Sequence, residues 1–465
     1  MKPLSARTRP RAITKPRVST LQSTRARLSL AIAYRSPNEL KPDPGNPRQH
    51  SAKQIDQIAT SIETFGFNVP ILIDDQSGVV AGHGRLSAAI RLGLTQVPTI
   101  TLAHLTDAQR KAFLIADNRL TEISTWDEAL LREQFLELSA ADLDFDLTVT
   151  GFDLAEIDLA IQGLDPAPAG PDPDDALPAL QPSVTRRGDL WLAGAHRVYC
   201  GDALDPASYG VLMPNECASV VFTDPPYNVK VSSISGKGRH QHREFAMASG
   251  EMNRREFTDF LRRACQLMVQ HSGDGSIHFI CMDFRHLREL LDAGESVYSE
   301  LKNLCVWAKN NGGMGSLYRS RHELIFVFKA GTASHQNHVA LGRFGRNRTN
   351  VWDYPTPHAI GGDADGEGDL LAEHPTPKPV AMIADALMDV STRGDLVLDP
   401  FLGSGSTLIA AERVGRIARG IELDPRYVDL ALRRWMRKAG RSPVHAALQL
   451  TFDEVRERRE EGGHA

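Results

Sequence analysis

A glycine-rich turn between a short apolar strand and a helix constrains the fold of this chain more than any other feature. Residues 396–398 have the apolar character of a buried strand, and the turn 399–406 follows directly. The next helix carries Leu408, Ala411 and Val414 at helical spacing. Such a turn lets a ligand approach closely, and the helix start offers free N–H donors. From residue 187 onward, apolar strand-like runs alternate with helical patterns, which predicts a doubly wound, mostly parallel α/β sheet, and the turn places a ligand site at its edge.

An acidic residue follows this turn at the spacing expected of a ribose-binding group. Glu422 lies 19 residues after Gly403, at the end of the predicted strand 418–421. Dinucleotide-type sites place a carboxylate at this point to accept hydrogen bonds from ribose hydroxyl groups. A glycine-rich turn with an ordinary surface glutamate is the alternative that these residues leave open.

A second motif, Asp224-Pro225-Pro226-Tyr227, ends the predicted strand 219–223. The two prolines fix the backbone and remove N–H donors, so the acid and the tyrosine are held rigidly at the sheet edge. The carboxylate can accept a hydrogen bond from an amino group, and the aromatic ring can stack on a flat base. The alternative is a plain turn, which the preceding apolar strand and the following tyrosine disfavour.

Together these motifs resemble the amino-methylating DNA methyltransferases in which the catalytic motif precedes the cofactor motif. The resemblance covers about residues 186–440 and includes the segments 191–202, 319–331 and 374–379. It implies a Rossmann-like methyltransferase fold, S-adenosylmethionine as the cofactor and double-stranded DNA as the partner. The implied reaction is site-specific methylation of adenine N6. Methylation of cytosine N4 stays as an alternative, because a leading aspartate favours adenine without excluding cytosine.

The resemblance also implies roles for individual residues. The implied catalytic loop is Asp224, Pro225, Pro226 and Tyr227, with Tyr227 stacking on the flipped base. The implied cofactor-binding residues are Asp202, Thr376, Lys378, Asp399, Phe401, Gly403, Ser404, Gly405 and Glu422. Asp202 would bind the adenine amino group of the cofactor, and Glu422 its ribose. Thr376 and Lys378 would help to seat its methionine moiety.

Basic residues in two regions are candidates for DNA contacts: Lys230, Lys237, Arg239, Arg343, Arg346 and Arg348. The first three lie in 229–250, which we interpret as a mobile loop closing over DNA, with a solvated loop as the alternative. The other three lie in 332–373, the expected sequence-reading region, where they could meet phosphates or guanines. The histidines at 240 and 242 have no acidic or cysteine partners at ligand spacing, so no metal site is predicted.

A smaller α/β unit is predicted over 34–125. At residues 46–48, 82–85 and 117–119 it resembles the ParB/sulfiredoxin-like domains. In that superfamily the glycine-arginine turn binds nucleotide phosphates. Nucleotide or DNA binding is therefore implied for Arg48, Gly82, His83 and Arg85. The sulfiredoxin cysteine is absent, which excludes that chemistry. A structural role and a nuclease are the alternatives to an accessory binding module.

Helix signals support this small unit. Ser51 with Gln54, and Thr106 with Gln109, form capping-box patterns that predict two helix starts. Gly66 supplies the stop for the first of these helices. Strands are expected over 69–73 and 97–102.

Charge is distributed unevenly along the chain, whose net charge is −5. Residues 1–33 are basic and rich in serine and proline, which predicts a disordered arm, with a DNA tether or a targeting segment as alternatives. Residues 133–185 hold twelve acids and no lysine or arginine. They belong to an acidic helical region and proline-rich linker over 126–185. A C-terminal tail is expected over 441–465.

The remaining composition limits the class of protein. No apolar run approaches the roughly 18 residues that span a bilayer, so no membrane partner is expected. The five cysteines form no CxxC pair, which argues for a reducing cytoplasm. Homodimerisation and a restriction or phage partner stay open. The rival from another class is a ParB-like DNA-binding regulatory or partition protein whose methylase half is inactive.

Overall fold

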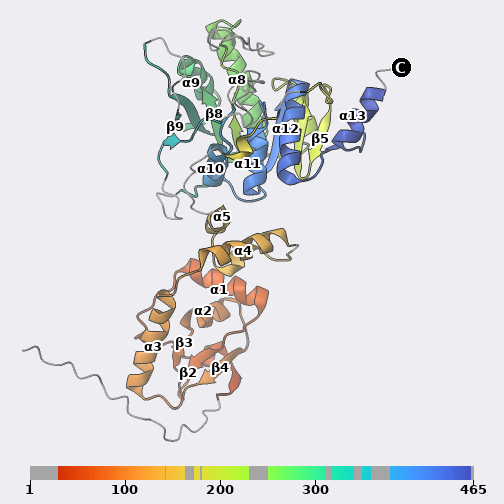
Figure 1. The fold of residues 1–465 in the computed structure, drawn as a ribbon. Coiled ribbons are helices and arrows are strands. Elements are labelled where there is room, and N and C mark those ends of the chain that lie inside the picture. The colour runs from red at the N-terminus through yellow and green to blue at the C-terminus, as the bar shows by residue number, and fades with distance from the viewer. Residues whose placement is uncertain are drawn as a thin grey trace, which may run out of the picture. The chain divides into compact units, whose positions relative to one another are not determined.

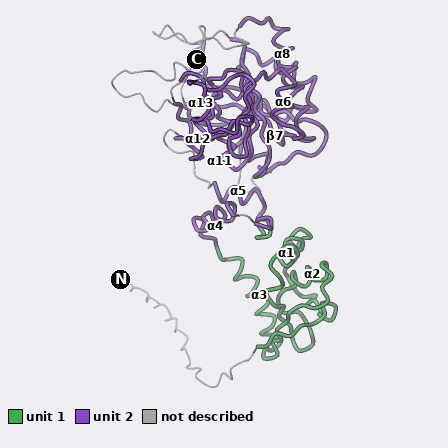
Figure 2. Tube along the Cα trace, turned by 90° about the vertical axis from the view of Figure 1, so that its right-hand side faces the viewer, with its two compact units in different colours: residues 1–125, 149–151 green, residues 126–148, 152–465 purple. Residues whose placement is uncertain are grey.

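The chain forms two compact units in the computed structural model (Figure 2): residues 1–125 with 149–151, and residues 126–148 with 152–465. The structure describes residues 30–141, 143–162, 172–178, 181–229, 250–310, 312, 317–339, 348–357 and 377–461. Within these ranges, no helix has both the length and the apolar character needed to cross a membrane.

The first unit is built on a four-stranded sheet of order β1-β4-β2-β3. Its strands are β1 (Ile32–Arg35), β2 (Ile71–Ile73), β3 (Val79–Ala81) and β4 (Val97–Thr101). Its helices are α1 (Ala52–Phe65), α2 (His83–Arg91) and α3 (Asp107–Glu122). The core is formed by Leu40, Ile71, Ile73, Val79, Leu86, Ala89 and Val97.

The two predicted capping boxes differ in the structure. Thr106 and Gln109 form the complete reciprocal box at the start of α3. At α1, the Ser51 side chain accepts the Gln54 N–H, but the Gln54 side chain contacts His50 at 3.0 Å. Strand β1 was not predicted, because it is an edge strand whose residues are mostly exposed and show no inward alternation.

The second unit is built on a ten-stranded sheet of order β11-β9-β10-β8-β7-β12-β13-β6-β5-β14. Its strands are β5 (Leu190–Ala193), β6 (His196–Cys200), β7 (Ala218–Thr223), β8 (Ser272–Met282), β9 (Glu300–Ala308), β10 (His322–Lys329), β11 (Val351–Asp353), β12 (Leu396–Asp399), β13 (Ile417–Glu422) and β14 (Val444–His445). The five central strands, β8 to β6, are parallel. The predicted doubly wound fold is confirmed, and β9 pairs antiparallel with β10.

Helices cover both faces of this sheet (Figure 1). They are α6 (Pro206–Leu212), α8 (Arg254–Gln270), α9 (Leu287–Glu295), α10 (Val380–Val390), α11 (Ser406–Val414), α12 (Pro425–Ala439) and α13 (Phe452–Glu461). Side chains from α10 to α13 share one core with Val220 and Phe222, whereas those of α6, α8 and α9 share the other with Val221. Successive residues of β7 thus face opposite cores, as strand geometry requires.

The end of the chain contradicts the prediction of a tail over 441–465. β14 pairs with β5, and α13 places Phe452 and Val455 in the core. The prediction failed because these two apolar residues stand in a highly charged segment and show no helical apolar stripe of useful length.

The predicted linker is also wrong over residues 172–178. Asp172, Asp175 and Leu177 are buried in the second unit, and Asp172 pairs with Arg413 at 2.6 Å. Proline and aspartate content alone predicted an extended, solvated segment. The partner that buries Asp172 lies 241 residues further along the chain, where composition cannot reveal it.

The acidic helical region precedes this segment as the helices α4 (Glu128–Ala140) and α5 (Leu154–Gln162). They enclose a small core of Phe135, Ile157 and Ile161. On α5, Asp158 is 2% exposed and forms an ion pair at 2.7 Å with Arg416, which is 1% exposed. This pair joins α5 to the segment between α11 and β13.

We predict that Asp158→Ala lowers the free energy of unfolding of the second unit by about 3–5 kcal/mol, because it leaves the Arg416 guanidinium buried without its carboxylate. Denaturant unfolding of the full chain measures this change. Glu137→Ala, an exposed acid on α4, is the matched control, with an expected change within about 0.5 kcal/mol. Equal effects of the two substitutions would contradict the prediction.

Candidate active site

The predicted catalytic and cofactor motifs meet at the carboxyl edge of the central sheet. β7 ends at Thr223 and β12 ends at Asp399, and the two strands pair in parallel. From β7 the chain continues to β8 on one side, and from β12 to β13 on the other. Open α/β sheets bind ligands outside the carboxyl ends of such strands, where the strand order reverses.

A buried hydrogen bond joins the two motifs. Thr223 Oγ1 donates to Asp399 Oδ1 over 2.8 Å, and the same carboxylate oxygen accepts the Phe401 N–H at 3.1 Å. Burial raises the pKa of Asp399 to about 6, although hydrogen bonds from Thr407, Thr223 and the Phe401 N–H oppose that rise. The first residue of the cofactor turn is therefore fixed to the last residue of β7.

Asp224 lies immediately beyond β7 and is held on both carboxylate oxygens. The Tyr227 hydroxyl donates to Oδ1 at 2.5 Å, and the Lys378 ammonium group donates to Oδ2. Lys378 also lies over the Tyr227 ring, 5.5 Å from its centroid. The two residues predicted to bind the base are thus locked to each other and to a residue from the segment before α10.

The ammonium group of Lys378 is shared by a second carboxylate that sequence reasoning did not assign. Glu323, at the start of β10, lies 3.0 Å from Lys378 Nζ and 3.3 Å from the Tyr227 hydroxyl. Lys309, just beyond β9, donates to its other oxygen. The antiparallel pairing of β9 with β10 sets Glu323 opposite Trp307 and so brings Lys309 and Glu323 to one sheet edge.

Burial and charge determine the protonation of this group. Burial alone would raise the pKa of Glu323, but the Lys378 and Lys309 ammonium groups outweigh it and hold the pKa well below its usual range. Burial would likewise lower the pKa of Lys378, yet Asp224 and Glu323 raise it well above its usual range. Burial, with the same two carboxylates, raises the pKa of Tyr227. The site therefore holds a charged Glu323, a charged Lys378 and a neutral Tyr227.

Asn228, the residue after the catalytic loop, is hydrogen-bonded to residues 250 and 252, which precede α8. Asn228 has a left-handed backbone (φ +51°) and is 9% exposed. Its side-chain amide accepts the N–H groups of Gly250 and Met252 and donates to the Met252 carbonyl at 2.8 Å. The start of α8 is thereby fixed beside the site.

The cofactor turn adopts the conformation that its glycines allow. Gly403 and Gly405 both have positive φ angles, +52° and +85°. A Cβ atom on Gly405 would lie 2.6 Å from the Ala431 Cβ atom of α12, so a side chain cannot fit there. Gly405 directly precedes α11, and the turn therefore directs free N–H groups of a helix start toward the sheet edge.

A buried arginine that sequence reasoning missed supports this turn. Arg434 of α12 is 3% exposed and donates to the Ser404 carbonyl at 2.7 Å, and to the hydroxyls of Ser404 and Ser406 at 3.1 and 3.3 Å. Burial lowers the pKa of Arg434 to about 10, against the attraction of Asp175 and Asp174. No local motif marks this residue, since it lies 30 residues beyond Ser404.

The two remaining acids of the predicted cofactor site lie at the ends of the next strands. Glu422 ends β13 and accepts the N–H groups of Gly403 and Asp424, each at 2.8 Å. Burial raises its pKa to about 7, although these two hydrogen bonds oppose the rise. Asp202, beyond β6, accepts the Leu204 N–H at 2.8 Å. Carboxylate oxygens have further acceptor positions, so both residues fit a ligand with hydroxyl and amino donors.

Several predicted residues lie outside the described parts of the chain: Thr376, Lys230, Lys237, Arg239, Arg343 and Arg346. Arg348 is described, and the prediction that it meets DNA is wrong in this structure. Its guanidinium lies 2.7 Å from Asp389 and 3.2 Å from Asp385, and it stacks over the Trp352 ring. The buried Asp389 and the partly exposed Asp385 of α10 therefore hold this arginine inside the unit, and no local sequence signal separates it from its two basic neighbours.

The residues predicted to bind nucleotide in the first unit gather around the start of α2. His83 Nε2 accepts the Asp43 N–H at 3.2 Å, and burial lowers the pKa of His83. Arg85 Nε is buried without a hydrogen-bond partner among the described residues. Arg48 instead pairs with Glu122 at 3.2 Å. Gly82, the N-cap of α2, has a positive φ of +98°, a backbone conformation that favours glycine.

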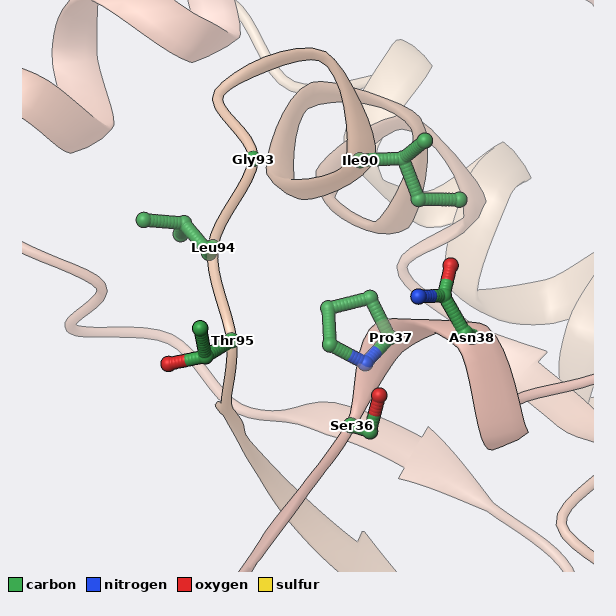
Figure 3. Close-up of a pocket in the computed structure, with 7 residues that line it drawn as sticks. All are labelled: Ser36, Pro37, Asn38, Ile90, Gly93, Leu94 and Thr95. Carbon is green, nitrogen blue, oxygen red and sulfur yellow. The ribbon is translucent and has the colours of Figure 1, made fainter.

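A separate pocket of about 370 Å³ lies at the other end of α2 (Figure 3). It is lined by Ser36, Pro37, Asn38, Ile90, Gly93, Leu94 and Thr95. α2 has nine residues, so its ends are about 13 Å apart. This pocket has no titratable lining side chain and does not include the predicted nucleotide residues. Among the described residues of the chain, no group of three or more His, Cys, Asp or Glu could hold a metal ion.

Comparison with protein families agrees with this architecture. Residues 218–433 match the N6/N4 family described as DNA methylase, and residues 24–118 match the ParB N-terminal domain. Residues 129–187 match the ParB-methyltransferase HTH domain, which sequence reasoning did not identify.

Two curated proteins are similar to different parts of the chain. The ParB-like nuclease domain-containing protein YnaK of Escherichia coli (strain K12) is 45% identical over 82 residues, 18% of this chain and 94% of that protein. The type II methyltransferase M.HinfI of Haemophilus influenzae is 27% identical over 243 residues, 48% of this chain. The chain spans 64% of the length of M.HinfI.

Solved structures show distant similarity. M1.HpyAVI is 18% identical, with a TM-score of 0.36, covering 51% of this chain and 96% of that one. A putative DNA modification methylase from Thermus thermophilus, complexed with S-adenosyl-L-methionine, is 24% identical, with a TM-score of 0.37, covering 52% and 94%. At these scores, neither similarity adds to the assignment.

The sheet topology, with the two motif loops at its carboxyl edge, is that of a Rossmann-like α/β fold. The second unit thus contains a region that matches the N6/N4 DNA methylase family, and the first unit contains one that matches the ParB N-terminal domain.

We predict that Lys378→Met lowers the free energy of unfolding by about 3–5 kcal/mol at pH 8, because Asp224 and Glu323 lose the cation they share. One of the facing carboxyl groups takes up a proton as the pH falls. The loss should therefore be smaller at pH 5. Denaturant unfolding at the two pH values measures both effects.

The matched control is Lys302→Met, which removes a half-exposed lysine paired with Glu300 on the same sheet. It should change stability by less than about 1 kcal/mol. A Lys378 variant that resembles this control at both pH values would contradict the prediction.

Proposed function

We propose that this protein is an S-adenosylmethionine-dependent DNA methyltransferase of the N6/N4 class, and that it methylates the exocyclic N6 amino group of adenine in double-stranded DNA. The observation that carries the proposal is the position of Asp224, one residue beyond the Thr223–Asp399 hydrogen bond that links the two motifs. A carboxylate at this point can accept a hydrogen bond from an amino group presented beside the cofactor turn. S-adenosylmethionine, when bound, supplies a methyl group on its positively charged sulfur.

The residues of the site act by holding the amino group rather than by strong base chemistry. An amino nitrogen conjugated to a purine ring is a poor nucleophile because its lone pair is delocalised. Hydrogen bonds to Asp224 and to a proline carbonyl of the loop would favour a pyramidal nitrogen with its lone pair aimed at the methyl group. Most of the rate gain then comes from positioning and from fixed charges in a site without water.

The contacts of Asp224 set a condition on this step. Lys378 and Tyr227 each occupy one of its oxygens, so the amino group must use a further acceptor position or displace one of them. The base must leave the duplex to reach this point. Because Lys378 lies over one face of the Tyr227 ring, a stacked base must use the other face or displace the lysine.

DNA contacts are proposed for basic residues outside the region matched by the HTH domain. Residues 129–187 contain Arg132, Arg186 and Arg187 as their only lysine or arginine side chains, against twelve acids. Phosphate binding depends on such cations. We therefore retain Lys230, Lys237, Arg239, Arg343 and Arg346 as the proposed DNA contacts, and Arg85 with its unpartnered Nε as the proposed phosphate contact of the ParB domain.

We predict that Asp224→Ala lowers methyl transfer from labelled cofactor to DNA by about 100- to 1000-fold, the usual loss of one positioned group at a reacting centre. Cofactor binding should change by less than about threefold, since Asp224 is not assigned to it. Chromatography of digested DNA identifies the labelled nucleoside. N6-methyladenine supports the proposal, and N4-methylcytosine in its place would overturn it. Asp144→Ala, an exposed acid, is the control.

We also predict that cofactor affinity depends on pH through Glu422. Its pKa is raised to about 7, so the group is protonated below that pH and charged above it. Ribose hydroxyls donate to the charged form, and binding therefore weakens as the pH falls below about 7. The Kd should rise by up to about tenfold per pH unit. Calorimetry between pH 5.5 and 8.5 measures this slope. Glu422→Gln should remove it; an unchanged slope in that variant would assign it to another group.

A further inference from the structure

The segment Asp172–Asp175 precedes the methylase motifs in the sequence and contacts the helices α10, α11 and α12, which lie beside the active site. Its residues lie in the short 3-10 turn Pro173–Asp175 and its cap. Asp172 and Asp175 are 7% and 5% exposed. Asp172 pairs with Arg413 of α11 at 2.6 Å, and Asp174 pairs with Lys438 of α12 at 2.8 Å.

One contact of this turn reaches the start of α10. Asp175 Oδ1 accepts the Val380 N–H at 2.8 Å. The helix has Pro379 as its N-cap, which supplies no side-chain acceptor. The first N–H groups of a helix need acceptors from outside the helix, and a negative charge is favourable there. Asp175 therefore caps α10 from a distant part of the chain.

This cap lies two residues from Lys378. Pro377 and Pro379 flank Lys378 and stiffen its backbone, so the position of the helix start sets the position of its Cα atom. From there its ammonium group reaches Asp224 and Glu323. A shift of the start of α10 would move the cation away from the catalytic loop.

A second contact of the same turn reaches the cofactor loop. The Asp174 carbonyl accepts from Arg434 Nη2 at 3.0 Å, while Nη1 of that guanidinium donates to the Ser404 carbonyl and to the Ser406 hydroxyl. The turn thus contacts the supports of both halves of the site, one through Val380 and one through Arg434.

We propose that Asp174 and Asp175 are positioning residues for methyl transfer. Asp175 holds the start of α10 so that Lys378 meets Asp224, and Asp174 holds Arg434 against the cofactor loop. The inference rests on the proposed function and adds to it a requirement outside residues 218–433. The active site is complete only when the segment before the methylase domain is docked.

The test compares three variants of the full chain with the wild type: Asp175→Ala, Asp175→Asn and Asp172→Ala. Asp175→Ala removes the acceptor and should lower kcat by about 10- to 100-fold, the cost of misplacing a reacting group by about 1 Å. Its KM for S-adenosylmethionine should change by less than about threefold. Asp175→Asn keeps an acceptor oxygen and should retain most of kcat. Asp172→Ala breaks the ion pair to Arg413 and the hydrogen bond from the Asp174 N–H but neither site contact, and should also keep kcat.

Asp172 and Asp175 are both buried at this turn, but only Asp175 contacts the start of α10. Asp172→Ala therefore measures the effect of loosening the turn alone, and Asp175→Ala measures the effect of losing the contact with α10. Melting temperatures are measured for all variants. Equal losses of kcat in Asp172→Ala and Asp175→Ala, or wild-type kcat in Asp175→Ala, would overturn the inference. If Asp175→Ala does not fold, Asp175→Leu fills the site without an acceptor and is judged by the same criteria. A wild-type chain that transfers no methyl group refutes the proposed function, and this inference falls with it.

Discussion

The parallel pairing of β7 with β12 is the constraint on which the rest of the site depends. It places the ends of two strands side by side, although their sequences are about 175 residues apart, and the Thr223–Asp399 hydrogen bond joins them. Because both loops leave the same edge, the catalytic carboxylate and the glycine turn share one small region. Every other element of the site, from Glu422 to Lys378, is placed relative to this pair of strand ends.

The charges at this edge are stable because they are matched. Removing a carboxylate or an ammonium group from water costs several kcal/mol, and a facing opposite charge recovers that cost only with good geometry. Here Asp224, Lys378, Glu323 and Lys309 alternate in sign along a chain of contacts. Such a chain of contacts places an opposite charge beside each group. Asp224 is thereby held where its carboxylate oxygens can accept a hydrogen bond from an amino group.

The parts of this site that could be predicted from sequence are those with local signals. The glycine turn, Asp224 and Glu422 each follow a strand, and strand ends in a parallel sheet meet at one edge. Lys309, Glu323 and Arg434 had no such signal, because their roles come from partners far away in the chain. For Arg348 the local signal was misleading. Its place in a basic stretch predicted a DNA contact, but its guanidinium pairs with Asp385 and Asp389 of the same unit. The buried turn at Asp172–Asp175 was missed for the same reason.

The acidic connector, residues 133–185, uses part of its negative charge in contacts with the methylase helices. A segment with twelve acids and no lysine or arginine would repel DNA if its charge were free. Asp158 is instead paired with Arg416, Asp172 with Arg413 and Asp174 with Lys438, while Asp175 caps α10. These carboxylates are directed inward to the methylase helices, where basic side chains and a helix start need them. These four of the twelve acids therefore stabilise the methylase unit, whereas Glu137 and Asp144 are exposed, and attraction of DNA must come from basic residues elsewhere in the chain.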